Sequence, residues 1–206
     1  MRLYGIRIRN AYAVGGITRG LLRIATGPCP KSLLLFEQKE LFEGYSITMA
    51  EESILRASKL LAERQLTIAF AESATAGWLC SEFALAPESG KILMGGIVCY
   101  DADIKKYLLK IPEDFIETYT PESAEVTEEL AKRLQNFIHA DIHVAVTGLT
   151  TPGGSETPEK PVGTMFIHLL IKGRSVPIRI LYKGSAEDII HQTVDCVAQK
   201  LITELT

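Results

Sequence analysis

The sequence has few cysteines, and they do not form a metal-binding pattern. Four cysteines occur in 206 residues, with no CxxC pair and no histidine at ligand spacing. A zinc site is therefore not expected. Scattered free thiols are typical of proteins kept in a reducing compartment, so a cytoplasmic location is the expectation.

The chain also lacks an excess of positive charge and a long apolar run. Its formal net charge is -3, whereas proteins that bind nucleic acids or membrane surfaces usually carry a basic excess. No apolar run approaches the roughly 20 residues that a membrane-spanning helix needs. Neither a nucleic acid nor a membrane is an expected partner. A hydrophobic content of 47% is enough to bury one core, but hardly two.

Acidic residues are absent from the first 36 positions, which carry six basic residues. Glycines and prolines there interrupt every apolar stretch. Three interpretations are open: a transit-type presequence, a short structured extension, or upstream sequence before a working start at Met49. The third is favoured because helical periodicity begins just after Met49. We expect residues 1–48 to be a weakly ordered basic leader, which on the third interpretation is not part of the working protein. Residues 49–206 are expected to form one domain.

The remaining sequence alternates between helical and strand-like stretches. Helices are predicted over 51–65, 74–85, 101–109, 123–139 and 185–205. Short buried runs predict strands over 66–71, 92–100 and 142–146, followed by a hairpin of strands 163–171 and 176–182. This order predicts an α/β fold, a three-layer α/β/α sandwich with a mixed sheet. Open α/β sheets bind ligands at the carboxyl ends of their strands, where three candidate segments lie.

The first candidate segment is the turn from Ala71 to Gly77, between a strand and a helix. The amides of a helix start can hold a phosphate or carboxylate. Ser73 could also be a nucleophile if a base lies close to it. From spacing alone, the favoured interpretation is that Ser73 or Thr75 caps the helix, which contributes about 1 kcal/mol.

The second candidate segment runs from Tyr100 to Lys105. A lysine that is partly desolvated in a cleft can have its pKa lowered enough to act as a base. The sequence by itself favours a solvated lysine beside Lys106 and an aromatic core residue at Tyr100. Both interpretations stay open at this point.

The third candidate segment is the loop from Thr147 to Gly154, which continues to Lys160–Thr164. Glycines after a buried strand let the backbone approach a ligand closely. The segment contains neither a Walker loop nor GxGxxG, so it does not match these nucleotide-binding motifs. Long loops in compact domains are usually either functional or disordered, and the sequence favours neither.

Taken together, the three segments resemble the C-terminal domain of the CinA-like, competence-damage-inducible family of nicotinamide-nucleotide amidohydrolases. That family's pattern is AES-x-TGG, a strand ending in VTY, a lysine five residues later, V-S at a helix start, TGxxGPGG, KPVGT and GDRxxVRxxTV. The counterparts here are AESATAG, VCY followed by Lys105, Ser123, TGLTTPGG, KPVGT from Lys160, and the segment from Gly184 to Val194. Order and spacing agree over the chain after residue 48.

The resemblance implies deamidation of nicotinamide mononucleotide to nicotinate mononucleotide and ammonia. Ser73 would be the nucleophile, and Lys105, with Tyr100 as a candidate helper, would activate it and handle the protons. The residues implied in substrate binding are Glu72, Thr75, Gly77, Ser123, Thr147 and Gly148. The implied partners are a small-molecule pyridine nucleotide and further copies of the chain in a homo-oligomer. No metal or organic cofactor is implied.

This chain departs from the family pattern at several positions. Ala76 replaces a glycine, and Thr150 and Thr151 add bulk in the glycine-rich loop, so the pocket is expected to be narrower or shifted. Ala186 and Ile190 replace arginines. An arginine that orients a phosphate contributes roughly 1.5 to 3 kcal/mol to binding. Its loss predicts that the affinity falls by about ten-fold or more. The alternative function is therefore a catalytically impaired relative that binds a nucleotide or a protein partner.

Overall fold

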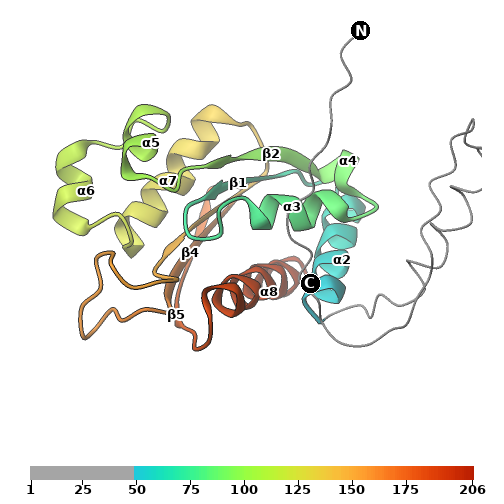
Figure 1. The fold of residues 1–206 in the computed structure, drawn as a ribbon. Helices are drawn as coiled ribbons and strands as arrows, with labels where there is room; N and C mark the ends of the chain where they lie inside the picture. Colours follow the sequence, from blue (N-terminus) through green and yellow to red (C-terminus); the bar gives the residue numbers. More distant parts are fainter. Residues whose placement is uncertain (1–48) are drawn as a thin grey trace, which may run out of the picture. The chain divides into compact units, whose positions relative to one another are not determined.

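The structure is a computed structural model that describes residues 49–206, and the expected leader lies outside this described part. Helices and strands follow one another along the chain as in Figure 1. The helices are α2 (Met49–Glu63), α3 (Trp78–Leu85), α4 (Ser89–Ile92), α5 (Ala102–Tyr107), α6 (Glu113–Tyr119), α7 (Ala124–Phe137) and α8 (Ala186–Leu205). The strands are β1 (Ile68–Glu72), β2 (Leu93–Val98), β3 (Ile142–Gly148), β4 (Thr164–Ile171) and β5 (Arg174–Leu181).

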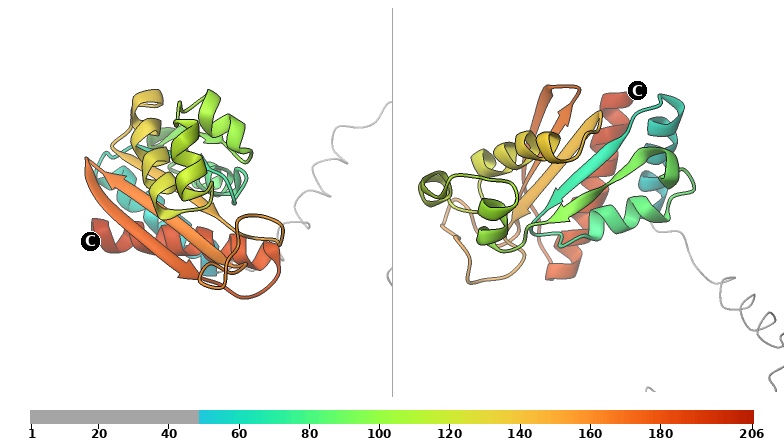
Figure 2. Two further views of the ribbon diagram at one scale, coloured as in Figure 1. Left: turned by 90° about the vertical axis from the view of Figure 1, so that its left-hand side faces the viewer. Right: turned by 90° about the horizontal axis from the view of Figure 1, so that it is seen from above.

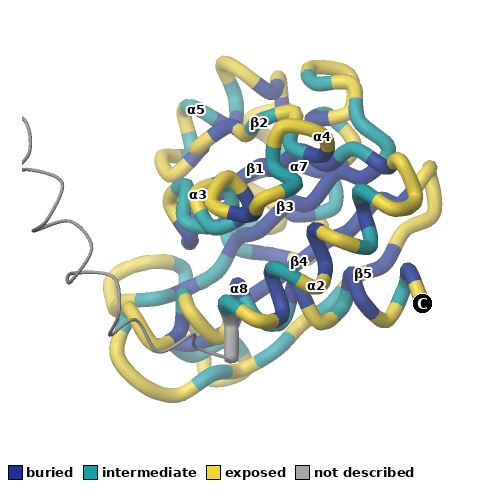
Figure 3. Tube along the Cα trace, turned by 90° about the vertical axis from the view of Figure 1, so that its right-hand side faces the viewer, coloured by how far each residue is buried: buried dark blue, intermediate teal, exposed yellow. Residues whose placement is uncertain are grey.

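The five strands form one mixed sheet in the order β2-β1-β3-β4-β5. β1 pairs in parallel with β2 and β3, whereas β4 pairs antiparallel with β3 and β5. The predicted mixed sheet is therefore confirmed, and so is the hairpin of β4 and β5. Figure 3 shows the central strands buried beneath the helices. No helix in residues 49–206 is long and apolar enough to cross a membrane.

Helices cover both faces of the sheet, as Figure 2 shows. Because successive side chains of a strand point to opposite faces, β1 sends Ile68 and Phe70 towards α2, α3 and α8. Its other face presents Ala69 and Ala71 towards α7. Small side chains on this second face leave room for α7 and for the segment that carries α5 and α6. The predicted three-layer arrangement is confirmed.

The start of α3 differs from the prediction. A helix was expected from Ala74, but α3 begins at Trp78. Ala76 and Gly77 have positive φ angles of 51° and 98°, which are left-handed and cannot continue a right-handed helix. Residues 74–77 therefore form a tight turn, which keeps Ser73 at the end of β1 and outside the helix.

Two short helices were not predicted, while the long terminal helix was. α4 replaces part of an expected loop, and α6 follows Pro112 in a stretch for which no element was expected. At α8, Ser185 and Asp188 form the expected capping box, in which each side chain bonds the other's main-chain amide.

Replacing Ala76 with glycine is expected to stabilise the fold. The change removes the cost of a left-handed backbone at a residue with a Cβ, which is roughly 1–2 kcal/mol. Glycine also gives the unfolded chain more backbone entropy, which offsets about 0.4–1 kcal/mol of this gain. The free energy of unfolding should therefore rise by about 0.5 kcal/mol. The matched control is Ala84→Gly on the exposed face of α3, which should lower it by about 1 kcal/mol. Urea titration measures both, and a loss of stability in Ala76→Gly would contradict the prediction.

Candidate functional site

Ser73 lies where the carboxyl ends of β1 and β3 meet. Its amide donates to the carbonyl of Val146 at 2.9 Å, which ties the residue after β1 to the neighbouring strand. On the other side, the amide of Cys99 donates to the carbonyl of Glu72 at 2.7 Å, which ties the residues after β2 to β1. The turn that carries Ser73 is therefore anchored on both sides, as expected for a ligand site in an open α/β sheet.

Lys105 reaches Ser73 from α5. Its Nζ lies 3.0 Å from Ser73 Oγ and 3.3 Å from the carbonyl oxygen of Tyr100. Asp101 begins this helix as predicted, because its side chain accepts from the amide of Asp103 at 2.7 Å. The Lys105 side chain is fully buried, so the solvated lysine that the sequence alone favoured is wrong. The structure thus brings together the two residues expected to act as nucleophile and base.

The surroundings of Lys105 favour its neutral form. Burial lowers the pKa of the amine, and the weaker influences of Cys99, Glu122 and Asp101 act in the opposite direction. Burial also raises the pKa of the Cys99 thiol to about 11, so this neighbour is uncharged at neutral pH. Within residues 49–206, no carboxylate lies within ion-pair distance of Lys105. A buried amine without a paired carboxylate can act as a base.

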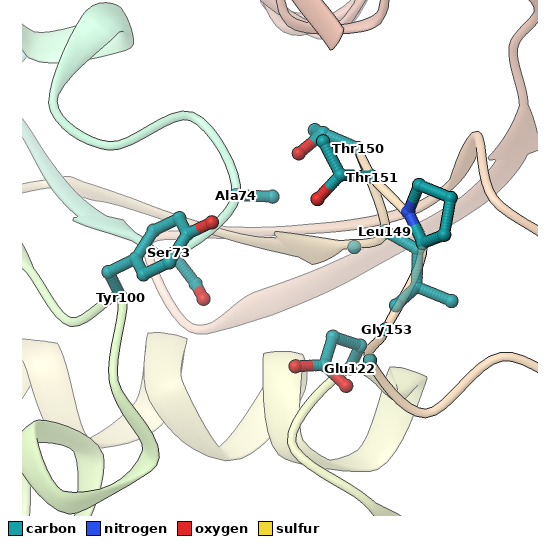
Figure 4. A pocket seen from close by; sticks show the side chains of 11 residues that line it. Ser73, Ala74, Tyr100, Glu122, Leu149, Thr150, Thr151 and Gly153 are labelled. Atoms are coloured by element: carbon teal, nitrogen blue, oxygen red, sulfur yellow. The ribbon is translucent and has the colours of Figure 1, made fainter.

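A cavity of about 220 Å³ opens beside Ser73. Its wall consists of Ser73, Ala74, Tyr100, Glu122 and the loop 148–154, and Figure 4 shows Ser73 and Glu122 on different sides of it. Tyr100 is 62% exposed, so its ring borders the opening, and the aromatic core residue considered from sequence is wrong. In the described part of the chain, no group of three or more His, Cys, Asp or Glu residues could hold a metal ion.

Five of the six predicted substrate-binding residues do not line this cavity, and three of the five surround the turn that carries Ser73. The buried carboxylate of Glu72 instead accepts from Thr75 Oγ1 at 2.7 Å and from the amide of Gly77 at 3.0 Å. It also accepts from the amides of Leu79 at 3.0 Å and Cys80 at 2.8 Å. These bonds satisfy the first amides of α3. Glu72, Thr75 and Gly77 therefore hold the turn that carries Ser73.

Ser123 and Thr147 are buried and do not line the cavity either. Ser123 begins α7 by accepting from the amide of Val126 at 3.2 Å. Thr147 Oγ1 lies 2.7 Å from Thr127 Oγ1, which joins β3 to α7 across the buried interface. Both residues thus hold α7 in place, and their contact with a substrate stays a prediction.

The third segment contains two predicted binding residues, Thr147 and Gly148, and of these Gly148 lines the cavity. Its φ is 157°, and an added Cβ would lie 2.7 Å from the carbonyl oxygen of Thr164 and 2.3 Å from Met165 Sδ. The residue must therefore be glycine because β4 approaches it closely. The close approach expected from the sequence occurs, and it is made by the chain itself.

The departures from the family pattern fall in different places. Thr150 and Thr151 belong to the cavity wall, so added bulk there bears on a ligand. Ala76 is exposed and outside the wall, and its effect is on the backbone. Ala186 and Ile190 lie on α8 and do not line the cavity either.

Lys160 was singled out only as part of a motif, but it organises the loop above the cavity. Its Nζ donates to Thr120 Oγ1 at 2.7 Å, to the carbonyl of Glu122 at 2.8 Å and to Ser155 Oγ at 2.7 Å. The 149–163 loop is thereby fixed to the turn before α7. In the sequence, the KPVGT motif pointed to Lys160. Nothing pointed to Glu122 except its position next to Ser123.

Replacing Glu72 with glutamine should destabilise the fold, because an amide nitrogen cannot accept from the amides that the carboxylate satisfies. Leaving a buried donor without a partner costs about 1–3 kcal/mol. The control is Glu82→Gln on α3, whose side chain accepts from Trp78 Nε1 and should lose about 1 kcal/mol or less. Urea titration of both proteins checks this, and equal stabilities would contradict the framework role of Glu72.

Comparison with known proteins agrees with this architecture. The family model described as the CinA C-terminal domain matches residues 50–205. A CinA-like protein of Thermotoga neapolitana is 35% identical over 156 residues, which cover 76% of this chain and 37% of that protein. A putative competence-damage inducible protein of Bacillus cereus is 32% identical over 164 residues, which cover 79% of this chain and 39% of that protein.

Solved structures give the same result. A CinA superfamily protein from Klebsiella pneumoniae superposes with a TM-score of 0.72 at 22% identity, over 76% of this chain and 97% of that one. One from Escherichia coli gives 0.70 at 26% identity, over 77% and 98%. The chain spans less than two fifths of the length of the curated relatives described above. Since the family model covers most of its length, the chain belongs to the CinA C-terminal domain family.

Proposed function

We propose that this domain hydrolyses the carboxamide of nicotinamide mononucleotide, giving nicotinate mononucleotide and ammonia. The observation that carries the proposal is the buried contact of 3.0 Å between Lys105 Nζ and Ser73 Oγ beside a cavity. A hydroxyl is a weak nucleophile until a neighbouring base removes its proton. The family includes nicotinamide mononucleotide amidohydrolases, which agrees with this chemistry.

In the first step, Ser73 Oγ attacks the carboxamide carbon while neutral Lys105 takes the hydroxyl proton. The carbonyl oxygen then carries a negative charge that needs hydrogen-bond donors. The amides of Ala74 and Thr75 donate to no acceptor within residues 49–206, and Ala74 belongs to the cavity wall. We assign these two amides as the donors that stabilise this oxyanion.

In the second step, the Lys105 ammonium returns the proton to the amide nitrogen as the carbon–nitrogen bond breaks. Ammonia leaves, and the substrate stays joined to Ser73 as an ester. A water molecule then attacks the ester carbon and gives a proton to Lys105, which passes it to Ser73 Oγ as the ester breaks. The products are a restored serine and the carboxylic acid, which gives its proton to the released ammonia in solution. One lysine therefore serves as base and acid in turn.

Tyr100 contributes through two different parts. Its main-chain carbonyl accepts from Lys105 Nζ at 3.3 Å, which holds the amine towards Ser73. Its ring lies at the mouth of the cavity, where an aromatic face can stack on a pyridine ring. In the proposed mechanism the phenol contacts the substrate, while Lys105 moves the protons.

Ser73→Ala should abolish ammonia release from nicotinamide mononucleotide, by at least about 1,000-fold, because the variant has no nucleophile. The control is Ser81→Ala, which changes an exposed serine of α3 and should keep full activity. Ammonia is measured with the full chain in a coupled assay. Undiminished release by Ser73→Ala would contradict the mechanism. Ligand binding without any release by the unmodified protein would favour the non-catalytic alternative.

The pH dependence of kcat/KM should report the Lys105 amine. Activity should rise with pH as Lys105 loses its proton, at a midpoint below the ordinary lysine range, because burial lowers the pKa of this amine. Lys105→Arg should be inactive at every pH, since a guanidinium keeps its proton. Lys106→Arg is the control: it keeps the charge that pairs with Asp103 and Glu113, so it should retain the profile. Activity in Lys105→Arg would exclude the amine as the base.

A further inference from the structure

Glu122 is the charged residue in the wall of the cavity. The other residues of the wall are neutral, and they comprise Ser73, Ala74, Tyr100 and the loop 148–154. Figure 4 shows the Glu122 carboxylate at the edge of the cavity, on a different side from Ser73. A ligand with its reacting group at Ser73 would extend towards this carboxylate.

The carboxylate is held so that one oxygen remains available. Ser155 Oγ donates to Glu122 Oε2 at 2.5 Å, and Lys160 in turn donates to Ser155 Oγ at 2.7 Å. Lys160 also donates to the main-chain carbonyl of Glu122 at 2.8 Å, which fixes the backbone of the turn. Glu122 Oε1 accepts no hydrogen bond from any residue that the structure describes. The free oxygen is therefore presented on a side chain whose position is already determined.

No cation of the described chain belongs to this wall. Lys105 is buried against Ser73 and the Tyr100 carbonyl, and Lys160 is engaged by three oxygens of the surrounding loops. A dianionic phosphate close to Glu122 would meet like charge, and the nearby Lys105 and Lys160 amines are already committed to oxygens of the protein. Hydroxyl groups, in contrast, would find an acceptor that forms charge-assisted hydrogen bonds. The electrostatics therefore favour a sugar at this wall over a phosphate.

Resting on the proposed function, we infer that Glu122 determines specificity by accepting hydrogen bonds from the ribose hydroxyls of a pyridine nucleoside whose carboxamide lies at Ser73. Carboxylates recognise ribose hydroxyls in the same way at other nucleotide sites. The 5′ phosphate, when a substrate has one, extends out of the cavity and adds little affinity. The substrate class is then pyridine carboxamide ribosides, with the phosphate dispensable.

The test is calorimetry on full-length protein carrying Ser73→Ala, which binds without turnover. The probes are nicotinamide, nicotinamide riboside and nicotinamide mononucleotide. The riboside should bind about ten-fold tighter than nicotinamide, and adding Glu122→Gln should remove this advantage while nicotinamide binding stays within about two-fold. The mononucleotide should bind within about five-fold of the riboside. The matched control is Glu125→Gln, which removes a nearby exposed charge outside the cavity and should leave all three affinities unchanged.

Several outcomes would overturn the inference. If Glu122→Gln weakens nicotinamide and the riboside equally, the residue acts only on the fold. If the mononucleotide binds about 100-fold tighter than the riboside, a cation holds its phosphate. If no probe binds, the cavity takes another class of ligand. Ser155→Ala is a second variant that should reduce the riboside advantage by releasing Glu122 Oε2. The proposed function fails separately, when the unmodified chain binds the riboside but releases no ammonia.

Discussion

The contact between the Lys105 amine and Ser73 depends on complete burial of the lysine. A buried ammonium is costly, so the neutral amine is favoured, and this is the form that can accept a proton. The amine keeps two hydrogen bonds, to Ser73 Oγ and to the Tyr100 carbonyl, which offset its loss of water. The short helix α5 after β2 carries that side chain, and its Asp101 cap sets where it begins.

A second buried charge determines where the serine lies. Four hydrogen bonds reach the Glu72 carboxylate, and three of them come from amides at the start of α3. Because anions are stabilised at helix N-termini, the strand end and the helix start are locked together. Ser73 stands between them with its own amide bonded to β3. The same sequence motif therefore supplies a structural carboxylate and, beside it, a hydroxyl that faces the cavity.

Much of the fold could be predicted from the sequence, because apolar spacing separates helices from strands and the order of elements limits the topology. The candidate segments could be placed at the strand ends for the same reason. The burial of Lys105 could not be predicted, since it depends on how α5 packs against the sheet. Nor could the inward orientation of Glu72. Lys160 contacts Thr120 across 40 positions of the sequence, a pairing that no local pattern encodes.

The charges around the cavity also bear on how the proposed reaction would end. Deamidation converts a neutral carboxamide into a carboxylate, so the product gains a negative charge that the substrate lacks. None of the residues that line the cavity is a cation that could pair with the product carboxylate. The formal charge of the wall is negative and comes from Glu122. In the proposed reaction Lys105 would return to its neutral form once the ester has broken, and it would not retain the product as an ion pair. The same electrostatics that would accept a sugar beside Glu122 would therefore favour departure of the acid and disfavour its return for the reverse reaction.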